Sequence, residues 1–273
     1  MNYQTFQPGN DLNPLVKCHW TLEVPAEFKS EKQKIVPDGC MELIFILGDD
    51  IKRYTSETDY IIQPRSIVVG QLTEPFTIQP VGYVHCFGTR FYPYGMANFI
   101  PTPLKNLENK ETPIAALFGQ ATADALTQKI IHAGSTAQRI ELIEAFLQHK
   151  LNEKTTIDHI VKSTVDALLE TSGSTPIKTI LKDDLSKRRQ LERKFLKQIG
   201  MSPKQLGKVV RLQTALKLLL DQKTGTFTEI AYESEYYDQN HFIKDFKEFT
   251  GTTPKEFLAD EQMLLSSLFY KPD

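Results

Sequence analysis

The sequence is poor in cysteine and has no long apolar run. Its 273 residues include three cysteines, Cys18, Cys40 and Cys86, with no CxxC pair. Three thiols cannot all pair within one chain, so we expect a reducing compartment and no disulfide scaffold. No apolar stretch approaches the roughly 20 residues of a membrane-spanning helix, and the first residues lack a basic segment followed by an apolar run. We therefore expect a cytoplasmic protein without a membrane partner.

The sequence also lacks a strong excess of charge of either sign. Its formal net charge is −2, which gives no overall electrostatic preference for nucleic acid. Residues 1–154 carry 14 basic against 17 acidic side chains, and residues 155–260 carry 17 against 15. Any surface that binds DNA must therefore be a local patch, and the carboxyl-terminal part is the better place for it.

The residues from Cys18 to about Tyr94 have the pattern of short strands. β-Branched and aromatic runs alternate with turn signals such as Pro37-Asp38-Gly39 and Gly48-Asp49-Asp50. No helical segments lie between the runs, which excludes a parallel sheet with crossover helices. We predict a small β-barrel or sandwich. The predicted strands are CHWTLEV, CMELIFIL, DYIIQ, SIVVGQL, FTIQP and VHCFGTRFY.

After Pro101 the apolar period changes from two to nearly four, which predicts helices. One helix is expected over ALFGQATADALTQKIIHAG, ending near Gly134, and a second follows directly. A third is expected from about Thr156 to Ser172, and the polar stretch LNEKTT before it marks a domain boundary. The expected domains are residues 1–154 for effector sensing or dimerisation, residues 155–262 for DNA binding, and a tail over residues 263–273.

From Thr175 the sequence predicts a short helix, a turn and a second helix. IKTILKDD forms the first helix, the turn lies near residues 183–185, and SKRRQLERKFLKQIG forms the second. Leu191, Phe195 and Ile199 recur at helical spacing, so the opposite face of this helix is exposed. Its cationic and amide side chains are of the kinds that bind phosphates and the base edges of the major groove. They are Lys187, Arg188, Arg189, Gln190, Arg193, Lys194 and Lys197.

The same order of elements recurs further along the chain. FTEIAYESE predicts a helix, Tyr236-Tyr237 lies in a turn, and Asp238 is placed to cap a helix over QNHFIKDFKEF. Its inward stripe is aromatic, Phe242, Phe246 and Phe249. Its outward side chains are Gln239, Asn240, His241, Lys244 and Lys247.

Matched segments close the two units, and this internal match is the strongest signal in the sequence. GMSPKQL spans residues 200–206 and GTTPKEFL spans residues 251–258. In each, Gly ends a helix, Ser or Thr caps the next, and Pro occupies its first turn. A basic helix face alone is as often a solvated surface, but the repeated unit favours DNA binding. Between the units, KQLGKVVRLQTALKLLL predicts a helix that separates the two recognition helices by about one DNA turn, roughly 34 Å.

The segment from about Thr156 to Leu258 resembles the DNA-binding domain of the AraC/XylS family of transcription regulators. RQLERKF, GMSPK, RLQTALKLLL and EIAYESEYYDQNHFIKDFKEFTGTTP carry the resemblance. It implies seven helices with two helix-turn-helix motifs, double-stranded promoter DNA as the partner, and RNA polymerase as a further partner of an activator. The base-reading candidates that it implies are Arg189, Gln190, Arg193, Gln239, Asn240, His241 and Lys244, and we add Arg188 and Lys197 from the exposed face.

Three departures from the family pattern concern the geometry of the motifs. Glu235 stands where the family usually has Gly in the second turn. SKRRQL is one residue longer than the usual spacing, which leaves Ser186 uncertain as a cap, and Ile180 replaces a small residue of the first helix.

The stretches VPDGCMELIFIL, VVGQL and FGTRFYPYGMANFI resemble the cupin-like amino-terminal domain of one AraC-type subgroup. Such domains serve as small-molecule sensors or dimerisation modules, so an effector pocket inside the barrel and a homodimer are expected. The candidate lining residues are Glu42, His85, Arg90 and Tyr92, because a polar group on an apolar strand either meets a ligand or faces solvent. The expected fold is α+β, a cupin-like β-barrel with a helical segment followed by an all-α domain with two helix-turn-helix motifs.

Two other functions fit parts of the sequence. A cupin-type metal enzyme with an accessory helical module requires metal ligands, but His19 and His85 lack the His-x-His pairing with Glu that metal-binding cupins show. No local signature of a cysteine nucleophile is present either, so we expect neither catalysis nor a metal or other cofactor. The other function is that of a regulator whose barrel only dimerises. A ligand-dependent change in thermal stability would separate it from a sensor.

Overall fold

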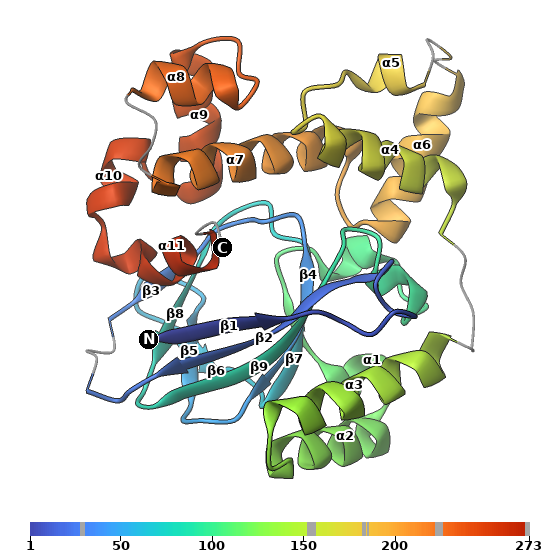
Figure 1. Cartoon of the computed structure of the whole chain (residues 1–273), viewed down its shortest axis with the longest axis vertical. Helices are drawn as coiled ribbons and strands as arrows, with labels where there is room; N and C mark the ends of the chain where they lie inside the picture. Colours follow the sequence, from blue (N-terminus) through green and yellow to red (C-terminus); the bar gives the residue numbers. More distant parts are fainter. Residues whose placement is uncertain (28–30, 152–156, 182–183, 185, 222–225, 271–273) are drawn as a thin grey trace.

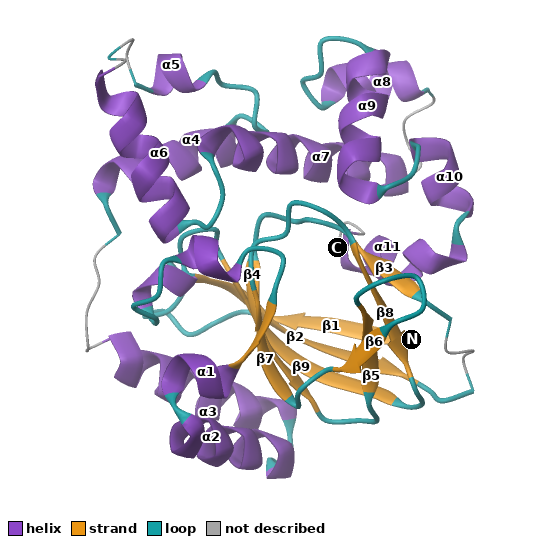
Figure 2. Cartoon of the chain, turned by 180° about the vertical axis from the view of Figure 1, so that it is seen from behind, coloured by secondary structure: helices purple, strands orange, loops and turns teal. Residues whose placement is uncertain are grey.

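The computed structural model places a β-rich part between two groups of helices (Figures 1 and 2). It describes residues 1–273 except residues 28–30, 152–156, 182–183, 185, 222–225 and 271–273. The expected domain boundary between residues 154 and 155 and most of the turn predicted at residues 183–185 lie outside the described residues. Within the described part, no helix is both long and apolar enough to cross a membrane.

Ten strands in the described part form two antiparallel sheets. They are β1 (Asn2–Phe6), β2 (Val16–Val24), β3 (Gln33–Ile35), β4 (Met41–Ile46), β5 (Ile51–Tyr54), β6 (Tyr60–Ile62), β7 (Ser66–Val69), β8 (Phe76–Pro80), β9 (Val84–Phe91) and β10 (Glu111–Pro113). The larger sheet has the order β1-β2-β9-β4-β7-β10, and the smaller has the order β3-β8-β5-β6. All six predicted strands are confirmed. The other four, β1, β3, β5 and β10, hold three to five residues each and were not predicted.

Three helices cover the outer face of the larger sheet, α1 (Ile114–Phe118), α2 (Gln120–His132) and α3 (Thr136–Leu151). Phe45, Phe87 and Phe91 from the sheet share a buried core with Ile130 and Leu147 from α2 and α3. The prediction of one continuous helix up to Gly134 is wrong in its first third. Gly119 separates α1 from α2 with a φ of 84°, a conformation that glycine adopts readily and other residues rarely do.

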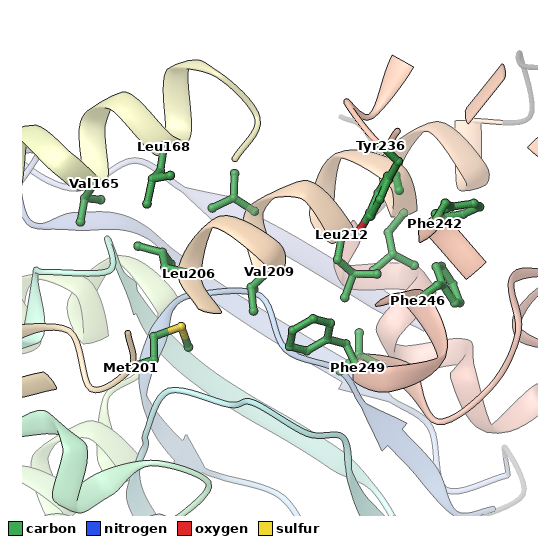
Figure 3. Close-up of a cluster of buried hydrophobic side chains, with 14 of the residues drawn as sticks. Val165, Leu168, Met201, Leu206, Val209, Leu212, Tyr236, Phe242, Phe246 and Phe249 are labelled. Carbon is green, nitrogen blue, oxygen red and sulfur yellow. The ribbon is translucent and has the colours of Figure 1, made fainter. Parts of the chain in front are cut away.

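Among the described residues from 159 to 259 there are seven α-helices, the number that the family resemblance implies. They are α4 (His159–Glu170), α5 (Ile177–Ile180), α6 (Ser186–Gln198), α7 (Pro203–Asp221), α8 (Phe227–Glu233), α9 (Gln239–Thr250) and α10 (Pro254–Ala259). α7 crosses the middle of this part, with α6 toward one end and α9 toward the other (Figures 1 and 2). Its Leu206, Val209 and Leu212 share one buried core with Leu168 of α4 and Phe246 of α9 (Figure 3). The two motifs are therefore packed on a common core.

The matched closures of the two motifs have the predicted conformations. Gly200 and Gly251 follow α6 and α9 with φ values of 97° and 76°. Thr253 then caps α10, whose first residue is Pro254. Pro203 is likewise the first residue of α7. These turns place each recognition helix against the helix that follows it.

The predicted tail contains a further helix. α11 (Leu264–Tyr270) follows a short 3-10 turn and lies against β3 (Figure 1). The Ser266 hydroxyl donates to the carbonyl oxygen of Lys34 at 2.7 Å. The Leu265 N–H donates to Oε1 of Gln33 at 3.1 Å, while Nε2 of Gln33 donates to the carbonyl oxygen of Glu261 at 3.1 Å. The carboxyl-terminal residues thus join the helical part to the barrel.

The Pro37-Asp38-Gly39 turn between β3 and β4 makes a second contact between the two parts. Nε2 of Gln213, on α7, donates to the carbonyl oxygen of Pro37 at 2.6 Å. Gly39 has a φ of 74°, and a Cβ atom there would lie 3.3 Å from the Leu206 side chain. Both the turn conformation and the close approach of α7 therefore favour glycine at this position.

Candidate DNA-binding surface and barrel cavity

The first recognition helix, α6, exposes the predicted side chains. Leu191 and Phe195 are fully buried beneath it, while all five predicted DNA contacts of this helix are exposed. Nε of Arg188 lies 3.2 Å from Oε1 of Glu192, which is a surface ion pair that DNA is able to replace. Lys194 turns to α4 instead, where Nζ donates to Asp158 Oδ2 at 2.5 Å. The five exposed contacts are Arg188, Arg189, Gln190, Arg193 and Lys197.

A shallow groove of about 470 Å³ runs beside α6 and reaches the barrel part. Arg189, Arg193 and Lys197 line one side, and Pro103 and Lys105 line the other. Lys105 lies in the 3-10 turn η2 (Leu104–Leu107) and pairs with Glu108. Sequence reasoning missed Lys105, because the proximity of η2 to α6 depends on how the two parts pack.

The second recognition helix, α9, begins at the predicted cap. Oδ1 of Asp238 accepts a hydrogen bond from the His241 N–H at 2.7 Å. Asn240 and Lys244 are exposed on the face opposite the aromatic stripe. Gln239 is half-buried, and its Oε1 accepts from the Thr228 hydroxyl at 2.6 Å. The Gln239 side chain, which the sequence assigns to base recognition, is thus already hydrogen-bonded to Thr228 within the motif.

His241 lies partly against the interior of the second motif. Its ring meets that of Tyr236 edge-on at a centroid distance of 5.4 Å, and its Nε2 lies 3.7 Å from Oδ2 of the buried Asp245. A side chain whose contacts are all within the motif makes no direct contact with a base. Asn240 and Lys244 are therefore the more accessible of the candidates on α9.

The turn of the second motif has a left-handed residue where the family usually has Gly. Glu235 adopts a φ of 62° and is exposed. Of the two tyrosines that follow, Tyr236 is 3% exposed and Tyr237 is 86% exposed. The sequence placed both in the turn, and adjacent identical residues gave no signal for which one points outward.

A cavity of about 90 Å³ lies between the two sheets. Most of its wall is aliphatic or aromatic, with Trp20, Ile44, Val69 and Phe76 among the lining residues. Leu265 and Phe269 of α11 also line it. The polar lining residues are Asp38, Glu42, Gln63, Arg90 and Glu111.

The polar side of the cavity is built around Arg90. Its Nε donates to Oε1 of Glu42 at 2.6 Å and lies 3.4 Å from Oδ2 of Asp38. Burial raises the pKa of the Glu42 carboxyl, against the opposing effect of the Arg90 guanidinium. Burial alone lowers the pKa of Arg90, but the two carboxylates beside it raise that pKa well above its usual value. Arg90 is therefore a paired cation.

A second polar group lies on β10. Oε1 of Glu111 accepts from Nε2 of Gln63 at 2.7 Å and lies 3.5 Å from Nε of Arg53. Burial raises the pKa of the Glu111 carboxyl. Oε1 of this carboxyl therefore has partners within the protein, whereas Oε2 is buried without a hydrogen bond to any residue that the structure describes.

The four predicted pocket residues fall in different places. Glu42 and Arg90 line the cavity. His85 is not among its lining residues, because it lies on the other face of β9 from Cys86 and Arg90, with Nε2 3.8 Å from Glu23 Oε1. Tyr92 lines a separate gap of about 360 Å³ between the barrel and α7.

The histidine and cysteine side chains of the barrel have ordinary surroundings. Nδ1 of His19 lies 2.9 Å from the Thr89 hydroxyl, and its Nε2 lies 3.1 Å from Oε1 of Glu144. Burial lowers the pKa of His19. Cys18, Cys40 and Cys86 are free and buried. Among the residues that the structure describes, no three His, Cys, Asp or Glu side chains form a group placed to hold a metal ion.

Comparison with protein families gives two matches. Residues 186–260 match the helix-turn-helix domain family, and this range contains α6 to α10. Residues 4–113 match a domain of unknown function, DUF6597, which spans the two sheets. No curated protein matches the chain.

Solved structures with a similar fold include that of ToxT from Vibrio cholerae. A structure of ToxT at 1.65 Å resolution shares 13% sequence identity over 95% of this chain and 98% of that chain, with a TM-score of 0.50. Wild-type ToxT with a bound unsaturated fatty acid shares 14% identity over 87% of this chain and 93% of that chain, with a TM-score of 0.47. The first of these supports the arrangement of an antiparallel-sheet domain followed by a helical domain.

Proposed function

Because the chain is a DNA-binding transcription regulator with an AraC-type helix-turn-helix domain at its carboxyl terminus, we propose that its two recognition helices bind adjacent major-groove segments of promoter DNA. We further propose that a small-molecule effector in the barrel cavity controls this binding. The site of action is then the cytoplasm. A homodimer and, for an activator, RNA polymerase are the further partners.

One observation carries the DNA-binding proposal. Two motifs of the same helix order lie toward opposite ends of α7 and share its core (Figure 1). At 1.5 Å per residue, the 19 residues of α7 span about 28 Å. This length is close to the roughly 34 Å that separates successive major-groove segments on one face of DNA.

The exposed side chains of the two recognition helices suit different parts of DNA. Arg189, Gln190 and Arg193 on α6 have the forked or amide geometry that recognises guanine or adenine edges. Arg188 and Lys197 flank them and suit phosphates. On α9, Asn240 and Lys244 are free to enter a groove, and Gln239 and His241 would first have to leave their partners within the motif.

The cavity supports the effector part of the proposal. It is largely apolar and contains a few placed polar groups, which is the usual character of small-molecule sites. Its lining also includes two residues of the carboxyl-terminal part, Leu265 and Phe269. A bound molecule would therefore contact both parts of the chain.

Capture of genomic fragments by the purified protein tests the function. We expect sequence-preferential retention that weakens steeply with salt, because cations on α6 displace counterions from phosphates. Retention should change when metabolite pools are added. If no fragment is retained preferentially at moderate ionic strength, with or without metabolites, the proposal fails.

A further inference from the structure

A side chain from the far end of the chain forms part of the wall of the barrel cavity. The ring centroid of Phe269, on α11, lies 5.2 Å from that of Tyr3 and 6.1 Å from that of Trp20. The guanidinium carbon of Arg90 lies 6.0 Å from the same ring. A phenyl ring of the carboxyl-terminal part thus occupies a place among the aromatic and polar groups of the barrel.

Polar groups of α11 and the Phe269 ring both bind this helix to the barrel. The Ser266 hydroxyl donates to the Lys34 carbonyl oxygen and accepts from the Val36 N–H at 3.3 Å. The Leu265 N–H donates to Gln33. Phe269 has no polar side-chain atom, so packing and the Arg90 guanidinium over its face hold the ring in the cavity wall. A ligand of the same shape would compete with these contacts.

The charges around the cavity indicate the class of ligand. Arg90 already faces the carboxylates of Glu42 and Asp38, and Glu111 is bonded to Gln63. A carboxylate ligand would find no surplus positive charge there. Burial of an unpaired ion of either sign is strongly unfavourable. An uncharged ligand avoids this cost and gains contact with the apolar wall.

The cavity is too small for a ligand the size of an aromatic ring unless a side chain in its wall moves. Its volume of about 90 Å³ is smaller than the engineered cavity of about 150 Å³ that binds benzene. A ligand of ring size therefore requires more room. Movement of the Phe269 ring out of the wall supplies it.

We propose that the cavity takes a compact, uncharged apolar or aromatic molecule, and that Phe269 fills part of this site until such a molecule displaces it and releases α11 from β3. This inference rests on the proposed function, in which the cavity is the effector site. α11 continues from α10, where Phe257 meets Phe246 of α9 edge-on at a centroid distance of 5.5 Å. Release of α11 therefore acts on the helix that supports the second recognition surface.

Toluene, which matches the side chain of phenylalanine, tests the ligand class in the full chain. Trp20 is the only tryptophan, so its fluorescence reports on the cavity. In Phe269→Ala, we expect toluene to bind about tenfold more tightly than in the unaltered chain, because a ring-sized space is open. Benzoate and benzylamine carry the same ring with a charge and should bind about tenfold more weakly than toluene.

Leu264→Ala is the matched control, because Leu264 lies on the same helix, is 46% exposed and is not among the cavity-lining residues. It should bind toluene as the unaltered chain does. If Phe269→Ala does not fold, Phe269→Leu replaces it, with a smaller gain in toluene affinity expected. Equal toluene affinity in the Phe269 and Leu264 variants would overturn the assignment of Phe269, and equal or tighter binding of either charged ring would overturn the ligand class.

Hydrogen exchange tests the release of α11. Toluene should speed exchange of the Val36 amide in the unaltered chain, and Ser266→Ala should speed it without ligand, because the serine hydroxyl accepts from that amide. Unchanged exchange on saturation with toluene would overturn the release. The proposed function is tested separately from the assignment of the ligand site. If toluene and hydrogen exchange behave as expected but no ligand alters retention of promoter DNA, effector control is wrong while the site assignment stands.

Discussion

The two recognition helices rest on one core but present different surfaces. α6 exposes five cations, Lys187, Arg188, Arg189, Arg193 and Lys197, together with Gln190. α9 exposes Asn240, Lys244 and Lys247, and part of its surface is bonded within the motif. The first motif therefore suits strong, salt-dependent attachment to phosphates and guanine edges. The second suits recognition by an amide and by shape.

The two motifs also differ in how their helices begin. α9 starts at the hydrogen-bonded cap Asp238, and α8 starts at a capping box formed by Thr226 and Glu229. In the first motif, Ser186 is the first residue of α6, and Oδ1 of Asp184 accepts from its N–H at 3.1 Å. The hydrogen bond from Lys187 lowers the pKa of Asp184 to about 2. The second motif thus combines a better capped frame with a strained turn at Glu235.

The largest expected effect tests whether the two motifs share one core. Phe195→Ala and Phe246→Ala each remove a fully buried ring, and each should lower the free energy of unfolding by about 3 to 5 kcal/mol. Urea denaturation followed by circular dichroism should show both variants shifting the same helical transition. Lys247→Ala, an exposed change on α9, should have little effect. Separate transitions for the two ring deletions would show that the motifs fold independently.

The next effect compares the contacts of the two helices with DNA. Arg193→Ala should weaken binding to a specific promoter fragment by about 1 to 3 kcal/mol and relax specificity at one position, as expected for a base contact. Asn240→Ala should cost a similar amount in the other half of the site, with less change in salt dependence because asparagine carries no charge. Fluorescence anisotropy over a series of salt concentrations measures both. A loss below about 0.5 kcal/mol for either variant would show that the residue is merely exposed.

The cap of α9 should have a smaller effect. Asp238→Ala removes the acceptor of the His241 N–H and should destabilise the helical part by about 1 kcal/mol. Asp238→Asn keeps a side-chain oxygen and should restore most of the loss. Thermal melts of the three proteins provide the measurement, and equal stability of all three would mean that the cap contributes nothing here.

The smallest expected effect concerns the turn of the second motif. Glu235→Gly should raise stability by roughly 0.5 to 1 kcal/mol, because glycine adopts the left-handed conformation without crowding its Cβ. Glu235→Ala, which keeps a Cβ, should not. A loss of stability in the glycine variant would indicate that the Glu235 side chain contributes more than the strain costs.

The sequence predicted the helical part better than the barrel for a physical reason. The spacing of Phe242, Phe246 and Phe249 and the glycine closures are local signals, and local signals survive in any tertiary context. β3, with three residues, exists because it pairs with β8. Strand pairing of this kind depends on segments far apart in the sequence.

The same contrast between local and long-range signals applies to the two candidate sites. Exposed positions on α6 follow from the helical period, so the sequence located them. The partnership of Asp38 with Arg90 brings together residues from a turn and from β9, and no spacing signals it. Phe269 lay in a predicted tail, since a seven-residue helix is too short to show a clear period. Its position depends on the barrel residues that it contacts.

A hydroxyl-radical footprint of the full chain on a captured promoter fragment tests most directly whether both recognition helices bind the same DNA. We expect two protected segments on one face of the duplex, with centres about 10 base pairs apart. Arg193→Ala should weaken protection of one segment, and Asn240→Ala should weaken protection of the other. Protection of a single segment, or loss of the same segment in both variants, would contradict binding by two recognition helices.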